Sequence, residues 1–265
     1  MEQGFTVREW WVESAKGALY GQIYIPERKE RCPLVIFSHE LFQTYRSGIP
    51  YAERLAALGY AVYLFDLRNT SPDSRSGTEL TEMSVMTNAE DLYAVMQAAG
   101  TWDFVQPGRL ALIGASQGGF ASAAVAAAHP KEVTALVLLY PALGIQRDAD
   151  RYPSREEIPE TFRFHGWFTA GRAYLADLWG YDPYKEMEKY PGPVLLLHGT
   201  KDPNMSVRYS EQAAAHFPNA RLHLIQNGFH GFWDACLEEA ADEIAAFLQK
   251  HYPAAAAAAE MEKQA

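Results

Sequence analysis

The amino-acid sequence predicts an α/β fold in which a mostly parallel sheet of eight strands carries helices on both faces. The first observation is a series of six short apolar runs that are mostly continuous, as expected of parallel strands covered on both faces. The second is that helical patterns alternate with these runs, which is typical of a doubly wound sheet. The third is size, because 265 residues, 48% of them hydrophobic, can bury one large core.

Two antiparallel strands precede the parallel ones. Residues 7–13 and 18–25 both have strand character, and Lys16-Gly17 between them predicts a tight turn, so we expect a hairpin. The six apolar runs predict strands at residues 34–37, 61–65, 110–113, 135–139, 194–197 and 222–225. Helical patterns predict helices at residues 51–58, 88–99, 120–129, 206–216 and 237–251.

Residues 141–193 do not follow this alternation. The segment is too long for a strand-to-helix connection and contains two pieces with helical character, at 159–168 and 172–178. It leaves the sheet at the carboxyl edge of a strand, where ligands bind in open α/β sheets, and long ordered insertions commonly cover a site. The expected units are a core of residues 1–140 and 194–253, a cap insertion of residues 141–193 and a flexible tail of residues 254–265.

Composition and charge exclude several classes of function. A formal net charge of -10 argues against nucleic acid and against an anionic membrane surface as partners, because both require a basic face. Cys32 and Cys236 fit a reduced interior better than a disulfide framework. The chain shows no signal-peptide pattern and no run of about 18 apolar residues, so we expect a soluble, cytoplasmic protein.

The sequence also indicates no bound metal or cofactor. No spacing of His, Cys and carboxylate residues resembles a metal-ligand set, and the chemistry described next needs none. The expected partner is a small-molecule substrate. The oligomeric state is not fixed by the sequence, and a homodimer remains open.

A candidate nucleophile lies where a predicted strand turns into a predicted helix. The segment Gly114-Ala115-Ser116-Gln117-Gly118-Gly119 follows an apolar run and precedes an alanine-rich helical stretch. A G-x-S-x-G turn in this position strains the serine backbone, lifts its hydroxyl clear of the sheet and directs free helix N–H groups at developing negative charge. The sequence therefore predicts Ser116 as a nucleophile.

A serine nucleophile requires a histidine to accept its proton and an acid to orient that histidine. Asp202 follows one predicted strand and His230 follows the next, so both are expected at the same edge of the sheet as Ser116, in the chain order serine, acid, histidine. Two alternatives stay open at this point. His198 could replace His230 as the base, and Asp66, after an earlier strand, could replace Asp202 as the acid.

The tetrahedral oxyanion of an acyl transfer needs two hydrogen-bond donors. One is expected to be the backbone N–H of Gln117, directly after the nucleophile. The other is expected from the loop that follows the third strand, residues 38–42. Because loss of one such donor costs on the order of 3–4 kcal/mol of transition-state stabilisation, this loop decides how effective the site can be.

These motifs together resemble the serine α/β-hydrolases, and among them the bacterial carboxylesterases of the cinnamoyl (feruloyl) esterase type. The resemblance covers nearly the whole chain through FSH at residues 37–39, TEMSVM at 81–86, GASQGG at 114–119, LLYPA at 138–142, HGTKDP at 198–203 and GFHGF at 228–232. It implies an α/β-hydrolase fold, with Ser116 as nucleophile, His230 as base and acid, Asp202 as orienting carboxylate, and the N–H groups of Leu41 and Gln117 as the oxyanion hole. It also implies that the insertion roofs the acyl pocket.

One residue departs from the pattern of these relatives, which usually have glycine where this chain has Glu40. An inward carboxylate would place negative charge near the developing oxyanion, an unfavourable interaction of roughly 1–4 kcal/mol at about 4 Å. We expect instead an outward side chain that pairs with Arg46 or Lys201. Asn69-Thr70 also stands where relatives tend to have glycines, which predicts a reshaped pocket rim.

The leading functional hypothesis is a serine carboxylic ester hydrolase that forms an acyl-enzyme on Ser116 and acts on small aromatic, hydroxycinnamoyl-type, or short to medium acyl esters. The expected substrate-contacting residues are Glu40, Phe42, Asp148, Asp150, Tyr152, Trp167 and Tyr174, with Asp148, Asp150 and Tyr152 as partners for a phenolic hydroxyl. Alternatives are a thioesterase, acyltransferase or peptidase with the same triad, because a fold does not fix the leaving group. A peptidase of the prolyl-oligopeptidase type would need a large gating domain, for which 265 residues leave no room. A non-catalytic binding protein, with an oxyanion hole impaired by Glu40, is the alternative outside enzymes.

Overall fold

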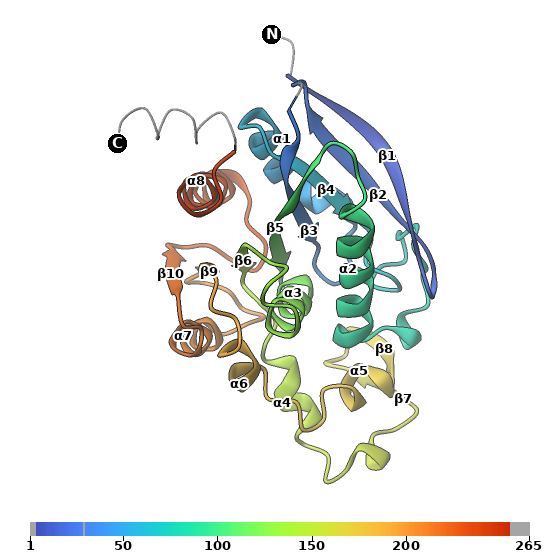
Figure 1. The fold of residues 1–265 in the computed structure, drawn as a ribbon. Coiled ribbons are helices and arrows are strands. Elements are labelled where there is room, and N and C mark those ends of the chain that lie inside the picture. Colours follow the sequence, from blue (N-terminus) through green and yellow to red (C-terminus); the bar gives the residue numbers. More distant parts are fainter. Residues whose placement is uncertain (1–3, 29, 255–265) are drawn as a thin grey trace.

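An eight-stranded, mostly parallel sheet forms the centre of the protein in a computed structural model that describes residues 4–28 and 30–254 (Figure 1). The strand order is β1-β2-β4-β3-β5-β6-β9-β10. The hairpin β1–β2 is antiparallel and pairs antiparallel with β4, and from β4 to β10 all neighbours are parallel. The strands of this sheet are β1 (Phe5–Ser14), β2 (Gly17–Pro26), β3 (Cys32–Ser38), β4 (Ala61–Phe65), β5 (Val105–Ala115), β6 (Ala135–Leu139), β9 (Val194–Gly199) and β10 (Ala220–Ile225).

Helices cover both faces of this sheet and enclose a separate hydrophobic core on each. Helices α1 (Ile49–Ala57) and α8 (Asp234–His251) pack on one face, and α2 (Val85–Ala99), α3 (Gln117–Ala128) and α7 (Val207–His216) pack on the other, as Figure 1 shows. Side chains of β3 alternate between the two cores, because successive residues of a strand point to opposite faces. The expected mostly parallel, eight-stranded α/β architecture is therefore confirmed.

The insertion differs from the sequence-based expectation in one element. The predicted helix at 159–168 is wrong, since β7 (Thr161–Phe164) and β8 (Phe168–Gly171) form an antiparallel hairpin there. His165 and Gly166 both have positive φ, at 47° and 76°, and this left-handed backbone makes the tight turn that a helix cannot contain. The second expected piece contains α5 (Ala173–Ala176), and α4 (Ile145–Ala149) and α6 (Pro183–Met187) flank the hairpin.

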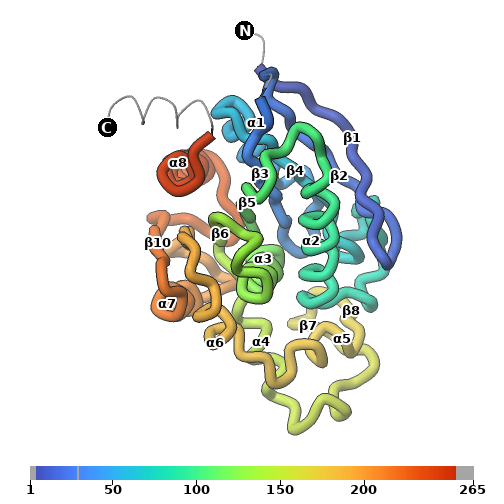
Figure 2. Tube along the Cα trace, viewed as in Figure 1, coloured from blue at the N-terminus to red at the C-terminus, as the bar shows by residue number. Residues whose placement is uncertain are grey.

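The tube in Figure 2 shows the insertion leaving the sheet after β6 and returning at β9. Short single-turn helices, η1 (Tyr45–Gly48), η2 (Leu80–Glu82) and η3 (Arg155–Glu157), complete the secondary structure. Residues 255–265, almost all of the expected flexible tail, lie outside the described residues. Among the described residues, no helix combines the length and hydrophobicity needed to cross a bilayer.

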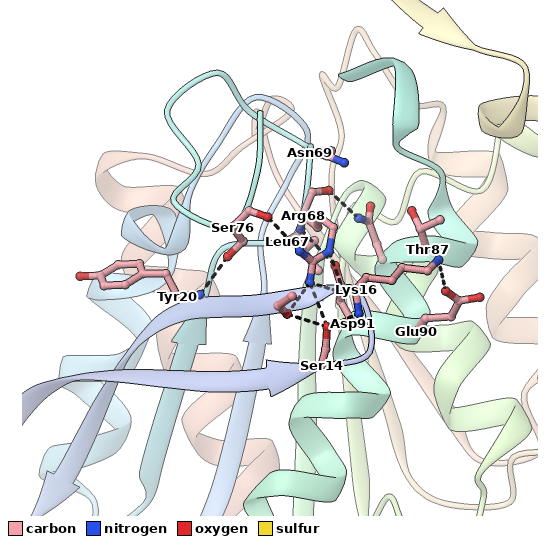
Figure 3. Close-up of polar contacts among 12 residues, drawn as sticks. Ser14, Lys16, Tyr20, Leu67, Arg68, Asn69, Ser76, Thr87, Glu90 and Asp91 are labelled. Carbon is pink, nitrogen blue, oxygen red and sulfur yellow. Dashed lines mark hydrogen bonds and ion pairs between the residues drawn. The ribbon is translucent and has the colours of Figure 1, made fainter. Parts of the chain in front are cut away.

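A buried ion pair fastens the N-terminal hairpin to the helical layer (Figure 3). Arg68, in the loop after β4, pairs with Asp91 of α2 at 3.3 Å and also donates to Ser14 Oγ and the Gly17 carbonyl in the β1–β2 turn. Burial raises the pKa of Asp91, and the Arg68 guanidinium opposes that rise. The loop that contains Arg68 is thereby held between the hairpin and α2, next to the carboxyl end of β4.

Candidate active site

Ser116 occupies a sharp turn between β5 and α3. Its backbone φ is 50°, a left-handed conformation that is strained for a residue with a side chain. The flanking glycines are needed because a Cβ on Gly114 would meet the Gly118 carbonyl oxygen, and a Cβ on Gly118 would meet the Ser38 carbonyl oxygen. The strand-to-turn-to-helix geometry expected of a nucleophile elbow is thus present.

Ser116, His230 and Asp202 form a continuous hydrogen-bonded chain. The Ser116 Oγ lies 2.9 Å from His230 Nε2, and His230 Nδ1 lies 2.7 Å from Asp202 Oδ2. Because a carboxylate only accepts, Nδ1 carries the proton and Nε2 is left to accept from the serine hydroxyl. This is the tautomer that general-base removal of the Ser116 proton requires.

The carboxylate of Asp202 is fully buried and receives four donors. His230 Nδ1 and His198 Nε2 approach Oδ2, and the backbone N–H groups of Asn204 and Met205 donate to Oδ1. Burial raises the pKa of Asp202, but the hydrogen bonds from His198 and His230 outweigh it and hold the pKa well below its usual range. Asp202 therefore stays ionised at neutral pH.

His198, the alternative base, does not reach the serine. Its Nδ1 is 2.7 Å from Ser210 Oγ, and its Nε2 is 2.9 Å from the Met205 carbonyl and 3.3 Å from Asp202. Since a carbonyl only accepts, Nε2 is the protonated nitrogen. His198 thus lies behind Asp202 and buttresses it.

Asp66, the alternative acid, binds backbone N–H groups of two loops. Its two carboxylate oxygens accept the backbone N–H groups of Tyr45 and Arg75, each at 2.8 Å. The side chain is fully buried and connects the loops after β3 and β4. It makes no hydrogen bond to a histidine within the part of the chain that the structure describes.

Backbone hydrogen bonds hold the loop after β3. The Phe42 N–H donates to the Thr70 carbonyl and that of Gln43 donates to the Glu40 carbonyl, whereas the Leu41 N–H has no acceptor among the described residues. Thr70 therefore supports this loop and does not line the cavity, which corrects the expected role of Asn69-Thr70 as its rim.

Buried His39 fixes the orientation of the Leu41 peptide. The Leu67 N–H donates to His39 Nε2 at 2.9 Å, so Nδ1 carries the proton and donates to the Glu40 carbonyl at 2.7 Å. In a trans peptide the N–H of Leu41 points away from that carbonyl. Burial lowers the pKa of His39, so it stays neutral and this arrangement persists at neutral pH.

The observed position of Glu40 corrects the expectation that its side chain points outward. It pairs with neither Arg46 nor Lys201, and its carboxylate accepts hydrogen bonds from Ser47 Oγ at 2.8 Å and from Tyr140 OH at 2.7 Å. All three of Glu40, Ser47 and Tyr140 line the cavity that contains Ser116. The carboxylate is therefore part of the cavity wall.

A cavity of about 1070 Å³ opens over Ser116 and His230. Of the expected substrate-contacting residues, Glu40, Phe42, Asp148, Trp167 and Tyr174 line it. Asp150 and Tyr152 do not, which corrects their expected role. The Asp150 carboxylate accepts from Gln146, and the Tyr152 carbonyl accepts from Trp179.

The Asp148 carboxylate is already occupied at the cavity wall. It pairs with His165 Nε2 at 2.9 Å and with Arg151 Nη1 at 3.1 Å. A phenolic hydroxyl would therefore have to share a carboxylate that two side chains of the insertion already bind.

A buried side-chain network behind the nucleophile was missed from the sequence. The Gln117 amide donates to Asn88 Oδ1 of α2 at 2.7 Å, and its oxygen accepts from Tyr174 OH of α5 at 3.0 Å. The Tyr174 hydroxyl is thus used inside the protein, although its ring lines the cavity. The network links the insertion to the residue whose backbone N–H is the expected oxyanion donor, and only the neighbouring position of Gln117 and Ser116 could have indicated it.

Several solved structures share this fold. Est1E from Butyrivibrio proteoclasticus aligns with a TM-score of 0.80 at 22% identity, covering 92% of this chain and 98% of Est1E. Alpha/beta hydrolase domain-containing protein 10 from mouse aligns with a TM-score of 0.72 at 20% identity, covering 92% of this chain and 99% of that one. These similarities confirm the α/β-hydrolase fold.

Sequence comparison finds a family and a curated relative. The quorum-quenching protein AidA of Acinetobacter baumannii is 30% identical over 98 residues, which are 37% of this chain and 32% of that protein. The model of the prolyl oligopeptidase family matches residues 50–253. The length of the sequence therefore does not separate this chain from that family. With more than half of its residues matched, the chain belongs to the prolyl oligopeptidase family within the serine α/β-hydrolases.

Proposed function

We propose that the protein is a carboxylic ester hydrolase that works through an acyl-enzyme on Ser116. The observation that carries this proposal is the hydrogen-bonded chain from Ser116 through His230 to Asp202, at the floor of a cavity large enough for a small ester. The fold and the family membership support hydrolytic chemistry in general, and the proposed triad gives it a specific mechanism.

In the first half of the reaction, Ser116 Oγ attacks the ester carbonyl carbon while its proton passes to His230 Nε2. The carbonyl oxygen becomes an oxyanion that the N–H groups of Leu41 and Gln117 would bind. When the bond from carbon to the alcohol oxygen breaks, His230 gives its proton to the leaving alcohol. In the second half, water repeats the attack on the acyl-serine and releases the carboxylic acid.

Asp202 would hold His230 in the required tautomer and stabilise the imidazolium that forms in each half-reaction. Its lowered pKa keeps the negative charge in place at neutral pH. Because the four donors already fill the lone-pair positions of Asp202, this carboxylate is held in one orientation.

The proposed substrates are small esters with an aromatic or a short to medium acyl group. Support comes from the aromatic side chains on the cavity wall, including Phe42, Phe164 and Trp167. The neighbour Est1E, which has been solved with ferulic acid bound, is consistent with an aromatic acyl group. The occupied Asp148 argues for esters that need no phenolic hydroxyl.

A labelling experiment tests the nucleophile. Incubation with a fluorophosphonate and mass mapping should find the adduct on Ser116, and the Ser116→Ala variant should remain unlabelled. An unlabelled wild type would favour a binding protein over an enzyme. Hydrolysis of p-nitrophenyl acetate and butyrate, and of methyl ferulate against an aliphatic methyl ester of similar size, then measures kcat/KM and assigns the acyl preference.

A further inference from the structure

The Glu40 carboxylate lies on the wall of the catalytic cavity without a cationic partner. Its neighbours are two neutral hydroxyl groups, on Ser47 and Tyr140, and it forms no ion pair with any residue of the described chain. A carboxylate offers about four lone-pair positions, so about two remain free. A partly buried charge with free lone-pair positions is unfavourable unless a ligand of opposite charge or a strong hydrogen-bond donor binds to it.

The tyrosine that binds this carboxylate belongs to an aromatic cluster. The Tyr140 ring, whose hydroxyl binds Glu40, packs against the Phe232 ring at 4.9 Å and against the His230 ring at 4.8 Å between centroids. Tyr51, from α1, also lines the cavity. Aromatic faces attract cations through the quadrupole of the ring, and quaternary ammonium groups are bound in this way.

Among the described residues, the other charged side chains of the cavity form no ion pair with Glu40. Asp148 forms an ion pair with Arg151 and also contacts His165 Nε2, both within the insertion. Arg147 lines the cavity from α4, where its guanidinium lies 5.4 Å from the centroid of the Tyr209 ring. Among the described residues, the cavity thus has a carboxylate without an ion-pair partner on the wall formed by the loop after β3, and a cation without one, Arg147, on the insertion.

We propose that Glu40 and the aromatic rings beside it bind a cationic nitrogen of the substrate, so that the preferred esters carry a quaternary or protonated amine close to the scissile bond. The inference rests on the proposed function. The cation is expected near the reacting carbonyl because Glu40 directly precedes Leu41, whose N–H is the proposed oxyanion donor. The overall charge of -10 would also raise the local concentration of cationic substrates.

The test compares two esters of the same shape and different charge. Acetylcholine and 3,3-dimethylbutyl acetate differ only in the replacement of the ammonium nitrogen by carbon. We expect the wild type to hydrolyse the choline ester with a kcat/KM about tenfold or more above that of the neutral ester, a preference of about 1.4 kcal/mol. In Glu40→Gln this ratio should fall to about one, because the shape is kept and the charge is lost.

The ratio of two substrates measured on one preparation does not depend on how much of the variant is folded. Glu53→Gln is the matched control, since it removes a carboxylate from the exposed side of α1 and outside the cavity, and its ratio should equal that of the wild type. Choline should inhibit the wild type at least about tenfold better than 3,3-dimethylbutanol, and this difference should disappear in Glu40→Gln.

Three results would overturn the proposal. A wild-type ratio of one or below rejects a cation subsite, and a stronger preference for an ester with a free carboxylate would assign recognition to Arg147 instead. A ratio that is unchanged in Glu40→Gln rejects Glu40 as its source. If Ser116 is labelled and the neutral ester is hydrolysed in any of these cases, the proposed function stands, whereas absence of both labelling and hydrolysis rejects the two together.

Discussion

Replacement of His198 by phenylalanine distinguishes the two histidines that approach Asp202. Phenylalanine resembles histidine in shape but can neither donate nor accept. In the wild type, His198 Nε2 contacts the Met205 carbonyl and Asp202, and its Nδ1 contacts Ser210 Oγ. The variant therefore removes three contacts behind the proposed triad and leaves the contact between Ser116 and His230 intact.

The expected loss of stability in this variant depends on which groups lose their hydrogen-bond partners. The Met205 carbonyl and the fully buried Ser210 hydroxyl would be left unpaired, and each such group costs about 1–3 kcal/mol. We expect the free energy of unfolding to fall by roughly 2–5 kcal/mol, which lowers the melting temperature by about 5–15 °C. Asp202 keeps three of its four donors, so kcat/KM at pH 8 should fall by only about tenfold.

The assay combines thermal unfolding with ester hydrolysis at a temperature where the variant is folded. His230→Ala is the reference, and its activity should be lower than that of the wild type by about 10³-fold or more. His198→Gln, which can still donate from its amide, should recover part of the lost stability. If His198→Phe were as inactive as His230→Ala while folded, His198 would take part in the chemistry and the reasoning would be wrong.

Three further variants test the surrounding site. Asp202→Asn should lower kcat by about 10⁴-fold, because an amide no longer imposes the required tautomer on His230, and activity within tenfold of the wild type would contradict this. Burial lowers the pKa of His39 from 6.5, so below about pH 6.5 the unfolded chain binds a proton that the folded chain does not. The free energy of unfolding should therefore fall by up to about 1.4 kcal/mol for each pH unit below about pH 6.5. Urea titrations of His39→Gln should show a weaker dependence of stability on pH. Tyr174→Phe leaves the Gln117 amide oxygen unpaired and should cost about 1–3 kcal/mol of stability, and an unchanged urea midpoint would show that this contact contributes nothing.

The main sheet could be predicted because burial on both faces imposes a pattern that is visible in sequence. Parallel strands with helices on each side must be apolar at nearly every position, so β4 and β6 begin and end at the predicted residues, 61–65 and 135–139. The hairpin β7–β8 lacks this constraint, since it lies outside the main sheet and mixes buried with exposed residues. Its aromatic positions fit a helical face about as well as a strand, and the turn at His165-Gly166 decided between them.

The sheet topology alone predicts that Ser116, His230 and Asp202 lie close together, although their catalytic roles stay a prediction. Carboxyl ends of parallel strands meet at one edge of the sheet, so residues that follow β5, β9 and β10 must lie near one another. The direction of the Glu40 side chain could not be predicted in this way. It depends on the Tyr140 hydroxyl, 100 residues away in the chain, and Tyr140 itself has a positive φ of 37° directly after β6.

The carboxylates of Asp202 and Glu40 differ in how many of their hydrogen-bonding positions the protein itself occupies. Asp202 has four donors for about four lone-pair positions, so its charge is engaged inside the protein and is proposed to act only through His230. Glu40 has two donors, both neutral hydroxyl groups, and its remaining positions are on a cavity wall. A negative charge in that place would oppose a developing oxyanion unless a cation shields it, by roughly 1–4 kcal/mol at about 4 Å. An ester that brings its own cation would remove this penalty as it binds, so the same residue that hinders neutral esters would favour charged ones.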